Sequence, residues 1–304
     1  MTNNTMYNDA VMSASKKGKS KTIISKVVIY IILVLYAAII LFPFAIVIIT
    51  SFKTWQESRD PIFKLFPEDG YVLDGYKFAF SFGIDQLGMD MPMLVKGFLN
   101  TLIYIIPPTF LGLFTSSLAA YAFAKLRFRA KNLMYGVLLA TMMIPGTITI
   151  PSTYSVYSML DLNQSPFPLM VPGMFGAAAC VFFMRQYFSG IPDSVVEAAK
   201  IDGVGYFGIF IKIIVPLAVP ALIAQGLLGF IGGYNDYFGP LIYLKDYEQF
   251  NLQLVLQFIN MAEGEKGPSN VMASTIVALL PTIAVYLIAQ DFFIEGIAAS
   301  GIKG

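Results

Sequence analysis

The polar residues whose spacing best suits a defined role lie between Ser194 and Gly203, in the stretch SVVEAAKIDG. Ser194 and Glu197 stand three residues apart, as in a capping box, where each side chain bonds a backbone N–H group at the start of a helix. Gly203 can adopt the left-handed conformation that ends a helix. The pattern predicts a polar helix of about two turns, about 12 Å long, which would be marginal in water on its own.

This short helix needs a surface to pack against. Val195, Ala199 and Asp202 share one face, and small side chains near the middle of the helix would let a partner approach closely. Two interpretations remain open on the residues alone. Either the segment is a well-capped helix at a membrane surface, or it is a docking element for another protein.

Catalytic chemistry finds little support in the rest of the sequence. The chain has no histidine, and its single cysteine, Cys180, lies in an apolar run. This excludes intrachain disulfides, thiolate metal clusters and CxxC redox chemistry. No carboxylate pair, nucleophile constellation or correctly spaced phosphate loop occurs. We therefore expect no enzyme activity, no metal site and no cofactor in this chain, so that any energy source must come from another protein.

The segments around the short helix are those of a membrane protein. Hydrophobic residues make up 57% of the 304 residues and charged residues 13%, against about 25% charged in a typical soluble domain. The mean hydropathy is +0.69, and several uninterrupted apolar runs are long enough to cross a bilayer. We expect an all-α polytopic membrane protein. The net charge of +1 gives no indication of nucleic-acid binding.

Six apolar segments predict about six transmembrane helices within one domain, residues 27–291. The predicted spans are 27–50, 97–124, 132–153, 167–187, 215–233 and 270–290. Residues 1–26 form a basic tail, residues 292–304 a short C-terminal tail, and residues 188–214 the loop that carries the polar helix. If the N-terminus is cytoplasmic, thirteen Lys and Arg residues lie inside and seven outside. The positive-inside rule therefore predicts that both termini and the 188–214 loop are cytoplasmic.

Polar residues at the outer end of the fifth span suggest a solute path. Tyr234, Asn235 and Asp236 occur there, in the stretch GGYNDYFGP. They either mark a helix that ends at the outer surface or line the mouth of a path. No charged residue lies securely inside any predicted span, which argues against a proton-coupled secondary transporter.

The loop at 245–268 has an ambiguous pattern. Its apolar residues alternate from Phe250 to Phe258, as in an extended segment, but Leu252, Val255 and Ile259 also follow helical spacing. We leave its conformation open. Its apolar residues either pack on the outer ends of the spans or belong to a surface that meets a partner.

The stretch EAAKIDGVGYFGIFIKIIVP, from Glu197 to Pro216, resembles the cytoplasmic loop of binding-protein-dependent ABC importer permeases. That loop reads E-A-A, three residues, G, nine residues, I, one residue, L-P, and the one departure here is Val215 in place of leucine. Other stretches are similar to the sugar-importer branch of the family, which includes the smaller permease subunit of the maltose importer. They are FLNTLIY, AYAFAKLRFRAK, MMIPGTITIPSTY, YNDYFGPLIYL and FFIEGIAASGIKG.

The resemblance implies a type I importer permease fold in the bacterial cytoplasmic membrane. It implies a coupling helix that docks on a cytoplasmic ATPase through Ser194, Glu197, Ala198, Ala199, Asp202 and Gly203. The implied partners are a second permease subunit in a heterodimer, two ATPase subunits that bind ATP and Mg, an extracytoplasmic solute-binding protein and a carbohydrate. Gln253 and Gln257 would then meet the binding protein, and Tyr234, Asn235 and Asp236 would line the substrate path.

Three alternatives remain beside this interpretation. The chain could be an ABC permease for a phosphorylated or other small solute, a secondary transporter, or a polytopic membrane enzyme. The sequence does not identify the sugar, its size or its charge.

Overall fold

The computed structural model describes residues 3–62, 64–263 and 267–301, and every regular element in these ranges is a helix. In chain order the elements are α1 (Asn3–Ser51), α2 (Trp55–Ser58), α3 (Asp74–Ala79), α4 (Ile84–Leu87), α5 (Met93–Lys125), α6 (Lys131–Met142), α7 (Gly146–Met159), α8 (Phe167–Met174), α9 (Ala178–Ser189), α10 (Asp193–Ile201), α11 (Tyr206–Ile209), η1 (Phe210–Ile214), α12 (Val215–Leu217), α13 (Val219–Tyr234), α14 (Phe238–Tyr243), η2 (Tyr247–Gln249), α15 (Leu252–Glu263) and α16 (Pro268–Gly301). The all-α fold class is confirmed.

Four helical segments of the described chain are long and apolar enough to cross a membrane: Lys26–Ser51, Met93–Lys125, Phe167–Ser189 and Pro268–Gln290. Two further segments qualify only as bent pairs. Lys131–Met142 and Gly146–Met159 meet at 94°, and Tyr206–Leu217 and Val219–Tyr234 meet at 81°. The six predicted spans are therefore recovered only if each bent pair counts as one.

The third and fifth predicted spans each contain a sharp break. Prolines lie at both breaks, and a proline lacks the N–H group that a helix interior needs. Pro145 precedes the first residue of α7 with an extended backbone. Pro216 and Pro220 flank the break at Ala218. The first helix also extends beyond its predicted span, since α1 begins at Asn3 within the predicted tail.

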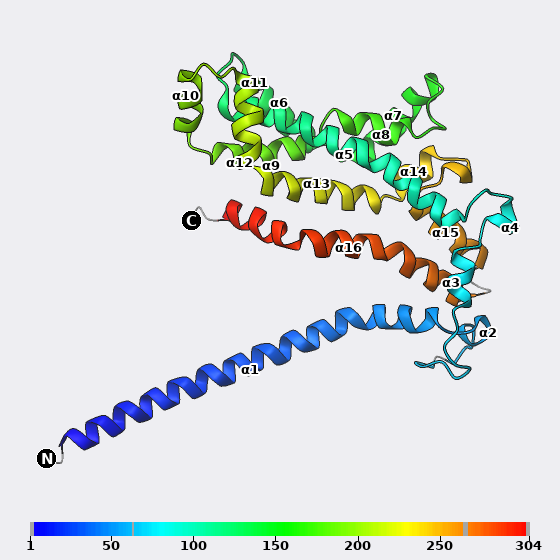
Figure 1. Cartoon of the computed structure of the whole chain (residues 1–304), viewed down its shortest axis with the longest axis horizontal. Helices are drawn as coiled ribbons and strands as arrows, with labels where there is room; N and C mark the ends of the chain where they lie inside the picture. Colours follow the sequence, from blue (N-terminus) through cyan, green and yellow to red (C-terminus); the bar gives the residue numbers. More distant parts are fainter. Residues whose placement is uncertain (1–2, 63, 264–266, 302–304) are drawn as a thin grey trace.

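Helix α5 is the central element. It packs against α8, α9, α13 and α15, and it runs the length of the bundle (Figure 1). Small residues allow the closest of these contacts, because a Cβ atom added at Gly112 of α5 would lie 2.3 Å from the carbonyl oxygen of Gly173 in α8. Close approach of this kind is typical of helix packing in membranes.

The break between α8 and α9 is satisfied by hydroxyl groups of α5. Gly176 takes a left-handed φ of 95° there. The hydroxyl of Thr115 donates to the carbonyl oxygen of Met174 over 3.0 Å, and the Ser116 hydroxyl accepts from the N–H of Ala177 over 3.0 Å. Irregular backbone at membrane depth is tolerated where protein groups satisfy it, so α5 makes this interruption possible.

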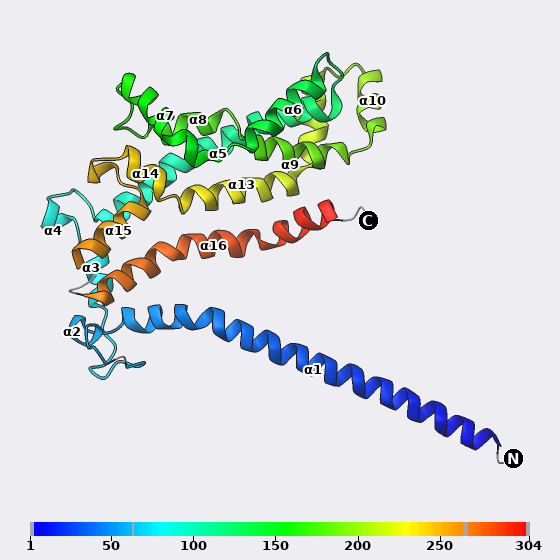
Figure 2. The ribbon, with the colours of Figure 1, turned by 180° about the vertical axis from the view of Figure 1, so that it is seen from behind.

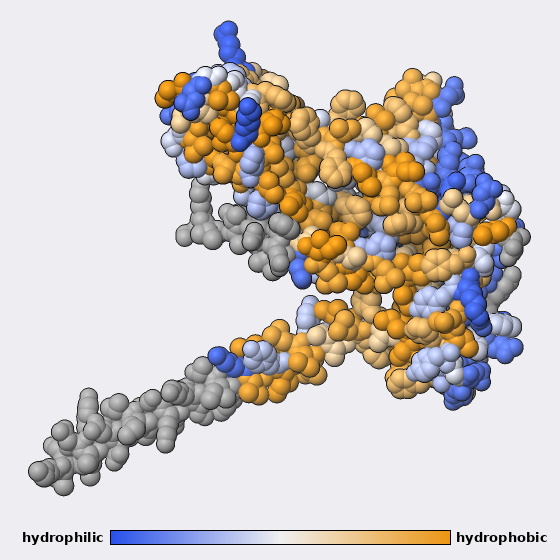
Figure 3. Space-filling model, in the orientation of Figure 1, coloured by the Kyte–Doolittle hydropathy of each residue, from blue (hydrophilic) through white to orange (hydrophobic). Residues whose placement is uncertain are grey.

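The molecule has two ends. Helices α10 and α11 lie at one end, toward which the C-terminal end of α16 also points, and α2, α3, α4 and α15 lie at the other (Figures 1 and 2). Apolar side chains cover the middle, and polar ones gather near the ends (Figure 3). Helix α1 contacts α16 near its own C-terminal end and then diverges (Figure 1), so that its apolar surface lies exposed in the isolated chain.

Candidate functional site

The polar helix predicted in the 188–214 loop is α10, and it begins differently from the prediction. Its first residue is Asp193, its N-cap is Pro192, and no side chain caps it. The predicted capping box of Ser194 and Glu197 is therefore wrong. Pro192, with φ −58° and ψ 135°, supplies the extended residue before the helix and so places Ser194 inside the first turn.

The end of α10 follows the prediction. Gly203 has a left-handed φ of 77°. Its N–H donates to the carbonyl oxygen of Lys200, and the N–H of Val204 donates to that of Ala199, both over 3.0 Å. These two bonds form a Schellman motif, which requires a residue that tolerates positive φ. The helix-ending role of Gly203 is confirmed.

The two faces of α10 are distinct. Val196 and Ala199 are 3% and 5% exposed and belong to a core cluster with residues of α5, α9 and η1. The predicted face of Val195, Ala199 and Asp202 is wrong in this respect, because Ala199 packs inside its own chain. The outward residues stand at positions i, i+3, i+4 and i+7 of one helical face: Ser194, Glu197, Ala198 and Ile201. Asp202 and Gly203 are also exposed.

A lysine at the end of α5 holds the start of α10. The Lys125 side chain is 3% exposed, and its Nζ donates to the carbonyl oxygen of Ile191 over 2.5 Å and to the Asp193 carboxylate over 2.6 Å. The hydrogen bond and charge of Lys125 lower the pKa of Asp193 below its usual value. Movement of α10 is therefore tied directly to α5.

The opposite end of α5 binds the segment before α15 mainly through neutral groups, beside a partly exposed ion pair in which Lys96 Nζ lies 3.1 Å from the Glu248 carboxylate. The Asn100 amide donates to the carbonyl oxygens of Glu248 and Phe250 over 2.8 and 3.0 Å. The Tyr104 hydroxyl donates to the carbonyl oxygen of Gln249 over 3.0 Å. The hydroxyl of Thr101 accepts from the N–H of Leu252, the first residue of α15, over 2.8 Å.

Helix α15 settles the conformation of the 245–268 loop, where two patterns were open. Leu252, Val255 and Ile259 are buried on one face, so the helical spacing is the one used. The two candidate contact residues lie elsewhere on this helix. Gln253 is partly buried and donates to the carbonyl oxygen of Tyr234 over 3.2 Å, whereas Gln257 is exposed.

The three candidate path residues point in different directions. Tyr234 is buried, and its hydroxyl donates to the carbonyl oxygen of Ala278 over 2.7 Å, so it packs against α16. The Asn235 side chain donates to the carbonyl oxygen of Ile231 in its own helix. Asp236 alone lines a cavity.

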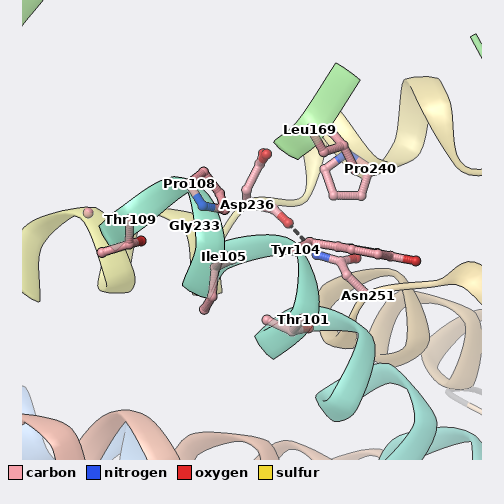
Figure 4. A pocket seen from close by; sticks show the side chains of 11 residues that line it. Thr101, Tyr104, Ile105, Pro108, Thr109, Leu169, Gly233, Asp236, Pro240 and Asn251 are labelled. Atoms are coloured by element: carbon pink, nitrogen blue, oxygen red, sulfur yellow. Dashed lines mark hydrogen bonds between the residues drawn. The ribbon is translucent and has the colours of Figure 1, made fainter. Parts of the chain in front are cut away.

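This cavity has a volume of about 250 Å³ and lies between α5, α8, α13 and α14. Its walls are formed by Thr101, Tyr104, Ile105, Pro108, Thr109, Leu169, Gly229, Gly233, Asp236, Pro240 and Asn251. Figure 4 shows Asp236, Asn251 and Tyr104 close together, with Thr109 farther along α5. The Asn251 amide donates to the backbone oxygen of Asp236 over 2.7 Å.

Sequence reasoning missed several of these residues. Lys125 was counted only for orientation, although a lysine that directly ends a long apolar run is also a candidate for bonding nearby backbone. Ile201 is 86% exposed, and its place four residues after Glu197 could have marked the outward face of α10. Tyr104 and Asn251 meet only through tertiary packing, so no local signal indicates them.

Among the residues that the structure describes, no group of three or more histidine, cysteine or acidic side chains could hold a metal ion.

Comparison with known proteins identifies close structural and sequence similarity. Residues 112–298 match the family model described as "Binding-protein-dependent transport system inner membrane component". A probable ABC transporter permease protein of Pyrococcus horikoshii is 32% identical over 259 residues, which cover 84% of this chain and 90% of the relative. The arabinooligosaccharides transport system permease protein AraQ of Bacillus subtilis is 31% identical over 231 residues, 76% of this chain and 79% of the relative.

A solved structure has the same fold. It is a bacterial ABC transporter involved in the import of the acidic polysaccharide alginate. One of its chains superposes with a TM-score of 0.74 at 25% sequence identity, over 89% of this chain and 96% of that chain.

Proposed function

Since the chain belongs to the family of binding-protein-dependent transport system inner membrane components, we propose that it is one of two permease subunits of an ATP-driven sugar importer in the bacterial cytoplasmic membrane. The chain is a multi-pass membrane protein and a transport subunit, not an enzyme. Permeases of this family work with an ATPase and a binding protein. The heterodimer with a second permease and the pair of ATPase subunits that bind ATP and Mg are part of the proposal.

The observation that carries the proposal is the construction of α10. It is a short helix with one buried face, one exposed face and a fixed end at Gly203. Lys125 fastens its start to α5. A rigid exposed helix tied to a central span suits a coupling helix, in which the ATPase moves α10 and α5 carries the movement into the membrane.

The outward residues Glu197, Ala198 and Ile201 form the proposed contact with the ATPase. Ala198 leaves room for close approach, and Ile201 offers an apolar side chain to a groove. Ser194, Asp202 and Gly203 lie at the edges of this surface, while Ala199 supports it from below.

The proposed orientation places both termini and α10 in the cytoplasm, and α2, α3, α4 and α15 outside. The distribution of Lys and Arg supports it, as does the position of α10 opposite α15 (Figure 1). To test it, single cysteines replace Ser81 and Ser189 in a Cys180→Ala background, and intact cells are treated with an impermeant thiol reagent. We expect Ser81→Cys to react and Ser189→Cys to be protected, and the reverse pattern would refute the orientation.

The substrate class rests on the relatives. AraQ belongs to a transport system for arabinooligosaccharides, and the chain of known structure to an importer of alginate. A sugar or oligosaccharide is therefore the proposed substrate, and a phosphorylated small solute is the second candidate, favoured by the glycerol-3-phosphate system of a further relative, UgpE of Escherichia coli.

The direct experiment is uptake into vesicles that contain the complete transporter. We expect uptake of a labelled oligosaccharide to require both ATP and the binding protein. Uptake that persists without ATP but collapses with the proton gradient would instead indicate a secondary transporter.

We also propose that α15 meets the docked binding protein through Gln257 and, less directly, Gln253. If so, replacing both with alanine should raise the concentration of binding protein that half-maximally stimulates ATP hydrolysis. An unchanged concentration dependence would show that α15 serves only to pack on the bundle.

A further inference from the structure

We propose that the cavity beside Asp236 binds a neutral, hydroxyl-rich ring of the substrate and excludes acidic solutes, so that this subunit contributes to selectivity. The inference rests on the proposed function as a sugar importer and narrows it to neutral saccharides. It also assigns to this chain a binding site separate from α10, toward the other end of α5.

The unused polar groups in the walls of the cavity are mainly acceptors. Asp236 presents a carboxylate whose Oδ1 accepts from the N–H of Gly239 over 3.2 Å, while no hydrogen bond joins its Oδ2 to any described residue. Pro108 has no N–H group, so the carbonyl oxygen of Tyr104 lacks the helical donor it would otherwise have. Sugar hydroxyls can donate to acceptors of this kind.

Most side-chain donors near the cavity are already used, although the Thr109 hydroxyl, which also lines it, makes no hydrogen bond to a described residue. The Asn251 amide donates to the backbone oxygen of Asp236, and the Tyr104 hydroxyl to that of Gln249. The hydroxyl of Thr101 donates to the carbonyl oxygen of Gly97. An anionic ligand needs donors or positive charges, and here it would find mainly occupied ones.

The charge in the wall of the cavity also favours a neutral ligand over an anionic one. Asp236 is the only Asp, Glu, Lys or Arg among the described residues that line the cavity. A carboxylate or phosphate on a ligand would face this carboxylate without a compensating cation, whereas a hydroxyl group would donate a charge-assisted hydrogen bond to it.

Size and shape agree with one ring. The volume of about 250 Å³ lies just below the range of about 300–1,000 Å³ for sites that take drug-sized ligands. Tyr104, Leu169 and Pro240 give apolar surface on one side (Figure 4). Gly229 leaves space, because a Cβ atom there would meet nothing closer than 3.7 Å, at Thr109.

The first experiment measures the charge selectivity of the cavity without any assumed substrate. Thr109→Cys is introduced in a Cys180→Ala background, and the assembled transporter reacts with positively and negatively charged methanethiosulfonates. Ser81→Cys corrects for the intrinsic rates of the reagents. We expect the positive reagent to be favoured several-fold, because the Asp236 carboxylate attracts it through partly hydrated surroundings, and Asp236→Asn to abolish the preference. Equal corrected rates with Asp236 present would overturn the proposal.

The second experiment measures protection of the same introduced thiol by saccharides. The neutral probes are arabinobiose, maltose and α-1,4-galactobiose, and the acidic probes are α-1,4-digalacturonate and glycerol 3-phosphate. At least one neutral probe should slow labelling about threefold or more, and no acidic probe should do so. In Asp236→Asn, digalacturonate should gain protection relative to the original protein.

Protection by an acidic probe alone, or by none of the probes, would refute the cavity as a neutral-saccharide site. Uptake assays keep this outcome separate from the proposed function. The Thr109→Cys transporter could take up a saccharide with ATP while its introduced thiol is not protected. The assignment as an importer would then stand, and only the role of the cavity as a binding site would be refuted. As an independent check, Gly229→Leu should fill the cavity and abolish protection.

Discussion

The two ends of α5 hold their neighbours by different means. At one end, a single buried ammonium group fastens α10 through Ile191 and Asp193. At the other, Asn100, Thr101 and Tyr104 make four neutral hydrogen bonds to residues 248–252, and the ion pair there, between Lys96 and Glu248, is partly exposed. There, α15 also buries Leu252, Val255 and Ile259.

This difference indicates that the two ends of α5 have different functions. The strong attachment through Lys125 lets α10 move as a rigid piece together with α5. At the opposite end, several weaker hydrogen bonds to the segment before α15 and to α15 itself hold these elements in a fixed position. Substitutions at the α10 end should therefore alter coupling, and substitutions at the α15 end should alter stability. The following predictions test that division.

The largest expected effect comes from Gly203→Pro. Proline cannot adopt the φ of 77° and removes the N–H that donates to Lys200, so the end of α10 must rearrange. We expect loss of transport and of substrate-stimulated ATP hydrolysis in the reconstituted transporter. Gly205→Pro is the matched control, because Gly205 already has a φ of −66°. Equal losses in the two variants would contradict a specific role for the helix end.

The next effect is that of Lys125→Met, which keeps an unbranched side chain of similar size but removes its charge and its donor. The carbonyl oxygen of Ile191 then loses a hydrogen bond from a charged donor, about 1.5–3 kcal/mol. We expect stimulated ATP hydrolysis to fall by about tenfold or more while the subunits stay assembled.

Lys131→Met is the control for this variant. Lys131 also donates to backbone oxygens, those of Ala124 and Leu126, but makes no hydrogen bond to α10. If both methionine variants reduce coupling equally, the attachment of α10 is not the cause.

A smaller effect, of a different kind, is expected from Asn100→Leu. Two backbone oxygens, of Glu248 and Phe250, lose their amide donor, which costs about 1–3 kcal/mol. Thermal unfolding of the assembled transporter should therefore begin at a lower temperature, while the ratio of stimulated to basal ATP hydrolysis stays unchanged. Asn132→Leu, an exposed site in α6, is the control. A changed ratio in Asn100→Leu would refute the division between the two ends.

The smallest effect concerns pH. Because Lys125 lowers the pKa of Asp193, this carboxylate contributes stability above its unfolded pKa of about 3.9, and that contribution is lost as the pH falls through the lower folded value. Asp193 is exposed, so the contribution is at most about 1 kcal/mol. Thermal unfolding of Asp193→Asn should differ slightly and constantly from the original between pH 5 and 8. A difference that varies across this range would contradict the assignment.

Local pattern and long-range packing explain which features the sequence predicts. The turn at Gly203 depends on a few neighbouring residues, and it is where the pattern placed it. The start of α10 depends on Pro192 and coincides with a bond to Lys125, which lies 68 residues before Asp193 in the chain, so the capping pattern alone misplaced it. The apolar runs coincide with helices long and apolar enough to cross a membrane, but neither hydropathy nor proline alone indicated which of them bend, since α5 contains Pro107 and Pro108 and stays one helix.

The cavity illustrates the same limit. Asp236 was a candidate because it is acidic and lies at the end of an apolar run. Tyr104, Pro108 and Asn251 become its neighbours only after α5 has packed against α13 and the segment before α15, and periodicity along one helix cannot indicate such a meeting.

The interruption between α8 and α9 has a consequence for biogenesis. Its broken backbone relies on hydroxyl groups of Thr115 and Ser116, which are synthesised well before it: 61 residues separate Ser116 from Ala177. When the ribosome delivers α8 and α9 to the bilayer, α5 is already there to receive them, so the interruption need not face lipid unsatisfied. A circular permutant in which α5 emerges last would expose it during synthesis, and we expect such a chain to insert poorly even though its finished contacts would be the same.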